Sequence, residues 1–344
     1  MEIVGLDLGC GYTKAVSGTR SDVFKSVIGT ASERPLSDDL ALTDASDRHR
    51  EFALADSGKR YYLGDLAERE CDSPKATLEA GEFFDEFAPS LAPASLAWLL
   101  GRDVEELGVV VGLPMAQFAD HRERLTDMLT GQHQVDLYER GGGSKRVKVT
   151  VSEVCVLPQP LGSALHLMLG DDGQVVEQEI FDKKIGVIDV GLHATGFAVA
   201  HRGDYSRRAS ATAPNGLARA YRVIADRLQE ASGVAVDLHR LSAVLQAGSI
   251  RIHGTRYDLR RIAEQAYEDL AIVIAKYAEK HWRDEWDLDV MLLTGGGGPL
   301  LAPWLAPALR GEVVLADEGT DPRLANAWGF AKYGRRLWSL SPSA

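Results

Sequence analysis

The chain has 344 residues, of which 38 are Lys or Arg and 50 are Asp or Glu, so its formal net charge is −12. This length exceeds what a single hydrophobic core usually supports, and we expect two domains of roughly 150 to 200 residues. The excess of acid argues against a protein that binds nucleic acid by its phosphate backbone, because that affinity comes from clustered Lys and Arg.

Cysteine usage and hydrophobic patterning indicate a reduced, cytoplasmic setting. Cys10, Cys71 and Cys155 stand far apart with no CxxC pair, which argues against a disulfide framework and a thiolate metal site. The opening MEIVGLDLG does not resemble a signal peptide, and no apolar run reaches the roughly 18 residues of a membrane span.

The first half of the chain predicts alternating strands and helices. An apolar run at 2–8 indicates a buried strand that turns at Gly9 and Gly11 and returns at 14–17. The polar stretch 28–80 predicts short antiparallel strands and loops. Helices are expected at 90–100, 116–130 and 161–169, and strands at 107–111 and, after a hairpin at 141–143, along the alternating run that ends at 158.

The second half restarts the same pattern. KKIGVIDVGLHATGFAVA at 183–200 has the layout of IVGLDLGCGYTKAVSG at 3–18: an apolar run, Asp, one residue, Gly, then Thr and a second run. This internal repeat predicts two similar halves that face each other across a cleft. The further elements expected are helices at 215–231, 256–282 and 321–337, strands at 289–294 and 312–316, and a helix between those strands.

The two repeated turns carry the residues that indicate chemistry. Asp7 ends a buried strand, and the glycines after it expose backbone amides to which an anion can bind. A carboxylate at that place suits a hydrated metal ion, although one such motif also fits a glycine hairpin whose Asp accepts bonds from turn amides. The second copy, with Asp189, Gly191 and Thr195, favours the binding of one nucleotide by both turns, with the two Asp sharing Mg²⁺.

A third element is the apolar strand that ends at Gly295, Gly296, Gly297 and Gly298. Without a Cβ, such a backbone allows a sugar or a flat ring to lie against it, which suits the adenosine end of a nucleotide. Taken alone, the same run also fits a flexible turn between a strand and a helix.

The order of these parts resembles the actin-like ATPase superfamily. Residues 5–14 and 186–195 resemble its two phosphate motifs, 292–298 its adenosine motif, and 156–165 and 325–334 its connecting segments. YYLGDLA, VVVGLP, VLPQPLGSAL and ANAWGFAKYG are similar to phrases of the bacterial and archaeal actin-like proteins of the ParM/StbA plasmid-segregation type.

The resemblance implies a fold and a set of binding residues. The fold is α/β, actin-like (ribonuclease H-like), with two duplicated domains and a nucleotide cleft between them. It implies a first domain at 1–160, with an inserted subdomain at about 22–90 and a returning helix at about 321–340, and a second domain at 161–320 with a small subdomain at about 211–288. The residues implied to bind nucleotide are Gly9, Gly11, Tyr12, Thr13, Lys14, Gly191, Leu192, His193, Thr195, Gly295, Gly296 and Gly297.

Gln159 occupies the position where the family places a Gln or Glu that orients the attacking water. An amide can align water but is a poor base, so the resemblance implies slow hydrolysis. Relatives commonly have Asp or His after the Thr of the second phosphate motif, whereas this chain has Gly196. His193 is an alternative water-positioning residue, and an exposed turn histidine is the simpler interpretation.

The function implied by the resemblance is an ATPase that forms filaments with ATP and disassembles after hydrolysis, with Asp7, Asp189 and Gln159 as its catalytic residues. Its partners would be further copies of the chain and an adaptor that binds plasmid DNA or other cargo. A small-molecule kinase and a non-polymerising regulatory ATPase of the same superfamily are the alternatives. A kinase needs a carboxylate base, and Gln159 serves that role poorly.

Overall fold

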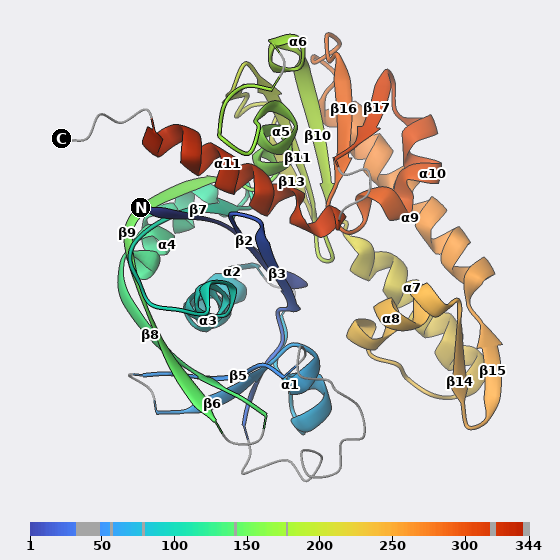
Figure 1. The fold of residues 1–344 in the computed structure, drawn as a ribbon. Coiled ribbons are helices and arrows are strands. Elements are labelled where there is room, and N and C mark those ends of the chain that lie inside the picture. The colour runs from blue at the N-terminus through green and yellow to red at the C-terminus, as the bar shows by residue number, and fades with distance from the viewer. Residues whose placement is uncertain are drawn as a thin grey trace. The chain divides into compact units, whose positions relative to one another are not determined.

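The computed structural model describes residues 1–31, 49–55, 58–77, 80–140, 143–176, 178–316 and 321–339. Contacts divide the chain into two compact units, shown together in Figure 1. Unit 1 comprises Met1–Ile180 and Arg323–Ala344, and unit 2 comprises Phe181–Pro322. Among the described residues, no helix is both long and apolar enough to cross a membrane.

Unit 1 is built on one mixed sheet with the strand order β3-β2-β1-β7-β9-β8-β5-β6-β4. Strands β1, β7 and β9 run parallel, and β2 and β3 continue antiparallel from β1. The strands span Glu2–Leu8 (β1), Tyr12–Ser17 (β2), Arg20–Lys25 (β3), Ile28–Thr30 (β4), Glu51–Leu54 (β5), Arg60–Leu63 (β6), Val104–Leu113 (β7), Gly131–Tyr138 (β8) and Ser144–Pro158 (β9).

Helices cover this sheet, and the alternation of side chains along β1 determines which residues they meet. Val4 and Leu6 belong to the core that includes helix α3 (Ala88–Leu100). Gly5 instead lies against helix α11 (Ala325–Ser339), so closely that a Cβ at this position would overlap a backbone carbonyl of that helix. Since alternate residues of a strand share a face, Asp7 lies on the face of Gly5, at the end of the strand.

Three further helices of unit 1 are α1 (Asp65–Glu70), α4 (Phe118–Leu129) and α5 (Leu161–Met168). Helix α5 packs against α11, and the two appear side by side in Figure 1. Their backbones meet where Gly162 faces Gly329, because no side chain fits between the two helices at that point.

Unit 2 has its own sheet, with the order β12-β11-β10-β16-β17 and β13 paired to β11. Helix α9 (Arg260–His281) packs against α7 (Leu217–Ser232) and α10 (Gly298–Ala308), and all three helices contribute to the core over the sheet. The strands span Lys184–Val190 (β10), Thr195–His201 (β11), Asp204–Tyr205 (β12), Ala211–Ala213 (β13), Val290–Thr294 (β16) and Glu312–Leu315 (β17).

The internal repeat predicted from the sequence is confirmed in the topology. The order β3-β2-β1-β7-β9 in unit 1 corresponds to β12-β11-β10-β16-β17 in unit 2. The directions also correspond: two antiparallel pairings are followed by two parallel ones in each series. Asp7 and Asp189 therefore hold equivalent positions near the ends of β1 and β10.

Several predicted elements differ from the structure. The second strand begins at Tyr12 rather than residue 14, because the turn before it is short. The helix predicted at 256–282 begins at Arg260, since residues 255–258 form a strand. The sequence interpretation also missed helix α8 (Leu238–Ala247) and the hairpin of β14 (Ser249–Ile252) with β15 (Thr255–Asp258).

Parts of the predicted polar region, residues 32–48, 56–57 and 78–79, lie outside the described residues, as do glycines 141 and 142 of the predicted hairpin. The predicted domain limits, 1–160 and 161–320, stay a prediction. The contact-based units differ from them by including helix α5 in unit 1.

Candidate functional site

The first turn, Gly9–Tyr12, joins β1 to β2 and holds Asp7 beside Lys14. The amide of Gly9 donates to the carbonyl of Tyr12 at 3.2 Å, which closes the turn. In the antiparallel register Asp7 lies opposite Lys14, and the Lys14 Nζ donates to Asp7 Oδ2 at 2.8 Å. Asp7 is only 1% exposed, so this ion pair is largely shielded from water.

Gln159 reaches the same carboxylate from the end of β9. Its backbone N–H donates to the carbonyl of Leu113, which fixes the backbone just after β9. Its side-chain Nε2 donates to Asp7 Oδ1 at 2.6 Å. The structure thus brings together Asp7 and Lys14 of the first phosphate motif and Gln159 of a connecting segment.

Ser26 braces the first turn, and the sequence interpretation missed it. Its hydroxyl donates to the carbonyl of Gly9 at 2.6 Å, and its amide donates to the carbonyl of Gly11 at 3.1 Å. The Thr13 hydroxyl lies 2.9 Å from Ser26 Oγ. Since the one Ser26 hydroxyl proton is used on Gly9, Thr13 is the donor of that bond. The predicted binding residue Thr13 is fully buried and holds the turn in place through Ser26.

The outer side of the first turn is held by two cations. The Arg323 guanidinium lies 4.6 Å from the centre of the Tyr12 ring. Lys25, opposite Tyr12 in the β2–β3 pairing, places its Nζ 2.9 Å from Asp65 and 2.5 Å from Glu68 of helix α1. Burial lowers the pKa of Lys25, but the hydrogen bonds to Glu68 and Asp65 raise it more, so the pKa lies above its ordinary value.

The second turn, Gly191–Ala194, repeats the first in backbone but not in side chains. The amide of Gly191 donates to the carbonyl of Ala194 at 3.0 Å, matching the bond of Gly9 to Tyr12. The residue opposite Asp189 is Gly196, where the first turn has a lysine. The Thr195 hydroxyl donates to the carbonyl of Asn215 at 2.6 Å and is fully buried, as Thr13 is.

Backbone groups at the start of helix α7 brace the second turn. The amides of Gly216, Leu217 and Ala218 donate to the carbonyls of His193, Gly191 and Leu192, at 3.0, 3.0 and 2.8 Å respectively. The peptide units of the predicted binding residues Leu192 and His193 are therefore fixed by the helix that follows. The His193 side chain is half-buried, and its alternative role in positioning water stays a prediction.

The glycine run after β16 lies against the second turn. Gly295 has φ +74, and a Cβ there would lie 2.7 Å from the Val190 carbonyl oxygen and closer still to the Asp189 carboxylate. The amide of Gly297 donates to the carbonyl of Val190 at 2.9 Å, while Gly296 is exposed at the tip of the run. Unit 2 thus gathers Asp189, the second turn and the predicted adenosine segment at one end of its sheet.

The donor set of the first turn fits a magnesium ion held mainly by water and phosphate. Both oxygens of Asp7 already accept hydrogen bonds from Lys14 and Gln159, so each has a lone pair left for a water molecule of a hydrated ion. In the described part of the chain, no three His, Cys, Asp or Glu side chains gather as a metal cluster. Mg²⁺ commonly keeps several waters and is shared with nucleotide phosphates, which suits a turn that offers one protein carboxylate.

Each unit contains a region that matches a model of an actin-related protein family. Residues 5–162 match a family model described as the N-terminal domain of actin-like proteins. Residues 187–306 match one described as the C-terminal region of the archaeal actin homologue, MreB-like. No curated protein sequence matches the chain.

Solved structures match over nearly the whole chain. A 15-stranded ParM filament from Clostridium botulinum matches with a TM-score of 0.81 and 22% identity, covering 97% of this chain and 99% of that one. The archaeal actin homologue Ta0583 in complex with ADP matches with 0.77 and 19%, covering 98% and 100%. ParM of Bacillus thuringiensis with ATP matches with 0.71 and 15%, covering 99% and 100%. These matches confirm the predicted actin-like α/β fold.

Proposed function

We propose, from the premise that this chain belongs to the actin-like protein family, that it is a magnesium-dependent ATPase that assembles into filaments with ATP. Hydrolysis weakens the contact between copies and times disassembly. The filament positions a cargo such as plasmid DNA through an adaptor protein, because the net charge of −12 disfavours direct binding of DNA by this chain.

The observation that carries this proposal is the repeated turn with a buried Asp near the end of a central strand. Asp7 and Asp189 occupy equivalent positions in two sheets of the same strand order. A nucleotide bound by both turns would have a carboxylate for hydrated Mg²⁺ on each side, backbone amides for its phosphates and Gly295–Gly297 for its adenosine. Relatives support the proposal: one is a filament, one is a complex with ADP and one contains ATP.

Within this proposal, Gln159 positions the attacking water. Its side chain already contacts Asp7, which places its amide next to the carboxylate assigned to the hydrated ion. An amide can hold a water molecule in line with the γ-phosphorus without removing its proton. The chemistry that Mg²⁺ supplies when bound is neutralisation of phosphate charge.

Sedimentation tests the assembly directly. We expect pelletable polymer above a critical concentration with ATP or a non-hydrolysable analogue, and loss of polymer with ADP, because the nucleotide must change the affinity between copies. Negative-stain images of the pellet distinguish filaments from aggregate. If the protein stays monomeric at tens of micromolar with every nucleotide, the proposal is wrong and a non-polymerising ATPase or a kinase becomes the better interpretation.

Gln159→Ala tests the hydrolysis step. We expect turnover to fall roughly tenfold to a thousandfold, the range for loss of a positioning contact, while ATP affinity and polymer formation persist. Filaments of the variant should therefore last longer. Gln134→Ala is a matched control, since Gln134 lies on β8 and its side chain donates to the side chain of Gln132 on the same strand. Phosphate release at the parent rate in assembled Gln159→Ala would remove this residue from the mechanism and make His193 the next candidate.

A further inference from the structure

Trp286 is the most exposed of the large hydrophobic side chains in the part of the chain that the structure describes. It is 88% exposed, on the loop Trp282–Asp289 between helix α9 and strand β16. We call this segment the Trp286 loop. This exposure excludes a place in the hydrophobic core. Exposed tryptophans are uncommon, whereas tryptophan is enriched among the residues that dominate binding energy at interfaces.

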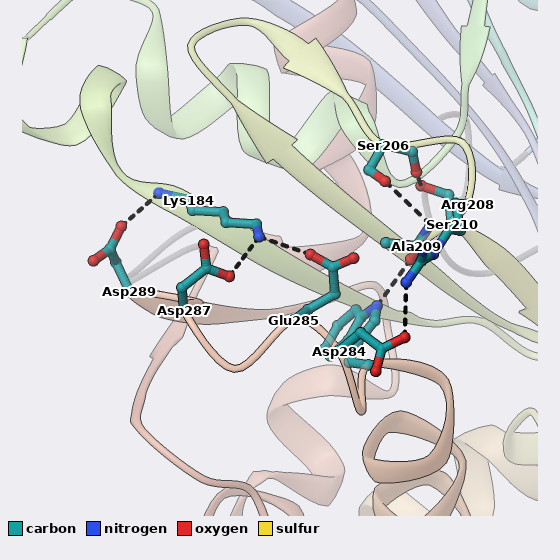
Figure 2. Close-up of polar contacts among 10 residues, drawn as sticks. Lys184, Ser206, Arg208, Ala209, Ser210, Asp284, Glu285, Asp287 and Asp289 are labelled. Carbon is teal, nitrogen blue, oxygen red and sulfur yellow. Dashed lines mark hydrogen bonds and ion pairs between the residues drawn. The ribbon is translucent and has the colours of Figure 1, made fainter.

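Lys184, the first residue of β10, holds both neighbours of Trp286. Its Nζ lies 2.6 Å from Asp287 Oδ1 and 2.7 Å from Glu285 Oε2, and Figure 2 shows the ammonium group between the two carboxylates. The amide of Lys184 donates to Asp289 Oδ2 at 2.7 Å, and the amide of Asp289 donates back to the carbonyl of Lys184. The residues on both sides of Trp286 are thus tied to one strand end.

The other end of the loop rests on the core. Trp282 is buried, donates from Nε1 to the carbonyl of Ala209 at 2.9 Å and packs edge-on against Phe197. Arg208 binds Asp284 at 2.7 Å, within the network drawn in Figure 2. A side chain on a loop held at both ends loses little conformational freedom on binding, so more of its contact energy appears as affinity.

Charge and position indicate what this surface binds. The carboxylates of Asp284, Glu285, Asp287 and Asp289 already have basic or backbone partners, so a basic protein or peptide would gain little by binding here. Two copies of a chain with net charge −12 repel each other, and a face with paired charges reduces that repulsion. Lys184 begins β10 and Asp189 lies near its end, so the loop is at the opposite end of that strand from the nucleotide residues.

We propose that the Trp286 loop is a self-association surface, and that Trp286 inserts into a second copy of this chain. This inference rests on the proposed filament function and adds the residue that anchors one side of the contact. In a filament the contact is heterologous, so Trp286 of one copy meets a different surface of the next. Its distance along β10 from Asp189 leaves the nucleotide residues free while the contact forms.

The test measures the critical concentration for ATP-dependent pelleting. We expect Trp286→Ala to raise it at least about tenfold, as for a central aromatic anchor, and Trp286→Phe to raise it less. Lys184→Met retains the tryptophan but frees its loop, and should give an intermediate increase. Val176→Ala is the control, because Val176 is 55% exposed in unit 1 and should leave assembly unchanged. ATP affinity and thermal stability should be unchanged in Trp286→Ala.

The outcomes separate the two proposals. If the wild-type protein pellets with ATP and Trp286→Ala pellets at the same concentration, the surface assignment is wrong and the filament function stands. If the wild-type protein never pellets, the filament function fails and the self-association surface fails with it. If Val176→Ala impairs assembly as much as Trp286→Ala does, the effect reflects general loss of surface hydrophobicity, and the specific anchor is refuted.

Discussion

The two turns have the same backbone and are stabilised in different ways. Each turn is closed by a hydrogen bond from the backbone amide of its first glycine to the carbonyl of its last residue, and each buries a threonine hydroxyl. The first turn is further stabilised by side chains. Lys14 and Gln159 donate hydrogen bonds to the Asp7 carboxylate, and the Ser26 hydroxyl donates to the Gly9 carbonyl. In the second turn backbone groups of helix α7 hold the turn, and Gly295 lies so close to Val190 and Asp189 that a Cβ would overlap them.

This difference predicts which kind of substitution destabilises each turn. A turn held by side chains is damaged when a side chain is removed, because its buried partners are left unsatisfied. A turn held by backbone groups and close packing against a glycine is damaged when a side chain is added, because there is no room for the added atoms. Substitutions of opposite kinds should therefore impair the two turns.

The largest effect should come from adding one methyl group in unit 2. Gly295→Ala combines a left-handed backbone, at φ +74, with overlap against Val190 and Asp189. We expect a loss of stability of about 3 kcal/mol and a loss of ATP affinity of at least about a hundredfold, because Asp189 must move. Thermal unfolding and titration calorimetry measure the two quantities.

Gly254→Ala is the matched control for Gly295→Ala. Gly254 has φ +83, but a Cβ there would meet nothing within 4 Å. It should cost only about 1 kcal/mol from backbone strain and leave ATP affinity unchanged. Equal effects of the two substitutions would show that the space beside Asp189 has no part in the site.

The next effect should come from removing the lysine of the first turn. Lys14→Met makes the position opposite Asp7 uncharged, as Gly196 is opposite Asp189. The Asp7 side chain is 2% exposed, so we expect the nucleotide-free protein to lose about 3 kcal/mol, the lower end for breaking a buried ion pair. Urea denaturation of the nucleotide-free protein measures this change.

Neutralising Asp7 in the same chain tests the cause. Asp7→Asn combined with Lys14→Met leaves no unpaired buried charge, so the double variant should regain most of the lost stability. If the double variant is as unstable as Lys14→Met alone, lost packing of the lysine stem explains the effect, and the charge does not.

Ser26→Ala should have a smaller effect on the same turn. The substitution leaves the Gly9 carbonyl and the Thr13 hydroxyl without a buried partner, which we expect to cost about 1 to 2 kcal/mol of stability and several-fold in ATP affinity. Ser95→Ala is the control, because Ser95 is equally buried and its hydroxyl has no hydrogen-bond partner among the described residues. If nucleotide affinity falls equally in both variants, the Ser26 hydroxyl does not shape the turn.

The features that could be predicted from the sequence are those encoded by neighbouring residues. The strand ends at Asp7 and Asp189, the glycines and the repeat are visible because each lies within a few consecutive residues with a distinctive pattern. Bringing Gln159 next to Asp7 required the family resemblance, since 152 residues separate them. Ser26 had no such signal, because a lone serine at a strand end is common and its partners lie 13 and 17 residues away.

The missed hairpin β14–β15 has a different cause. Its turn uses His253 at φ +46 and Gly254 at φ +83, two left-handed residues in succession, as a tight hairpin turn requires. His-Gly is a less usual pair for such turns than Asn-Gly or Asp-Gly. The polar strand after it, TRYD, runs directly into the periodic sequence of α9. The helix is therefore predicted to begin at residue 256 rather than at Arg260.

The smallest effect should be a pH-dependent one at the outer side of the first turn. Lys25 ties β3, opposite Tyr12, to Asp65 and Glu68 of helix α1. Its pKa in the folded chain is raised above the ordinary value of 10.5, despite the opposing effect of burial. A group with a raised folded pKa stabilises the fold fully below its unfolded pKa, and this contribution is lost as the pH rises through the folded value.

Lys25→Met should therefore cost less than about 1 kcal/mol at pH 8, because the pair is partly exposed to solvent and water screens it. The difference in unfolding free energy between wild type and variant should shrink above about pH 10.5, where the unfolded lysine loses its proton. Comparing the two proteins at each pH cancels the other groups that titrate in alkali. A difference that stays constant to pH 11.5 would mean that Lys25 acts by packing its aliphatic stem. The first turn would then depend on side-chain volume at its outer side and on charge only at Asp7.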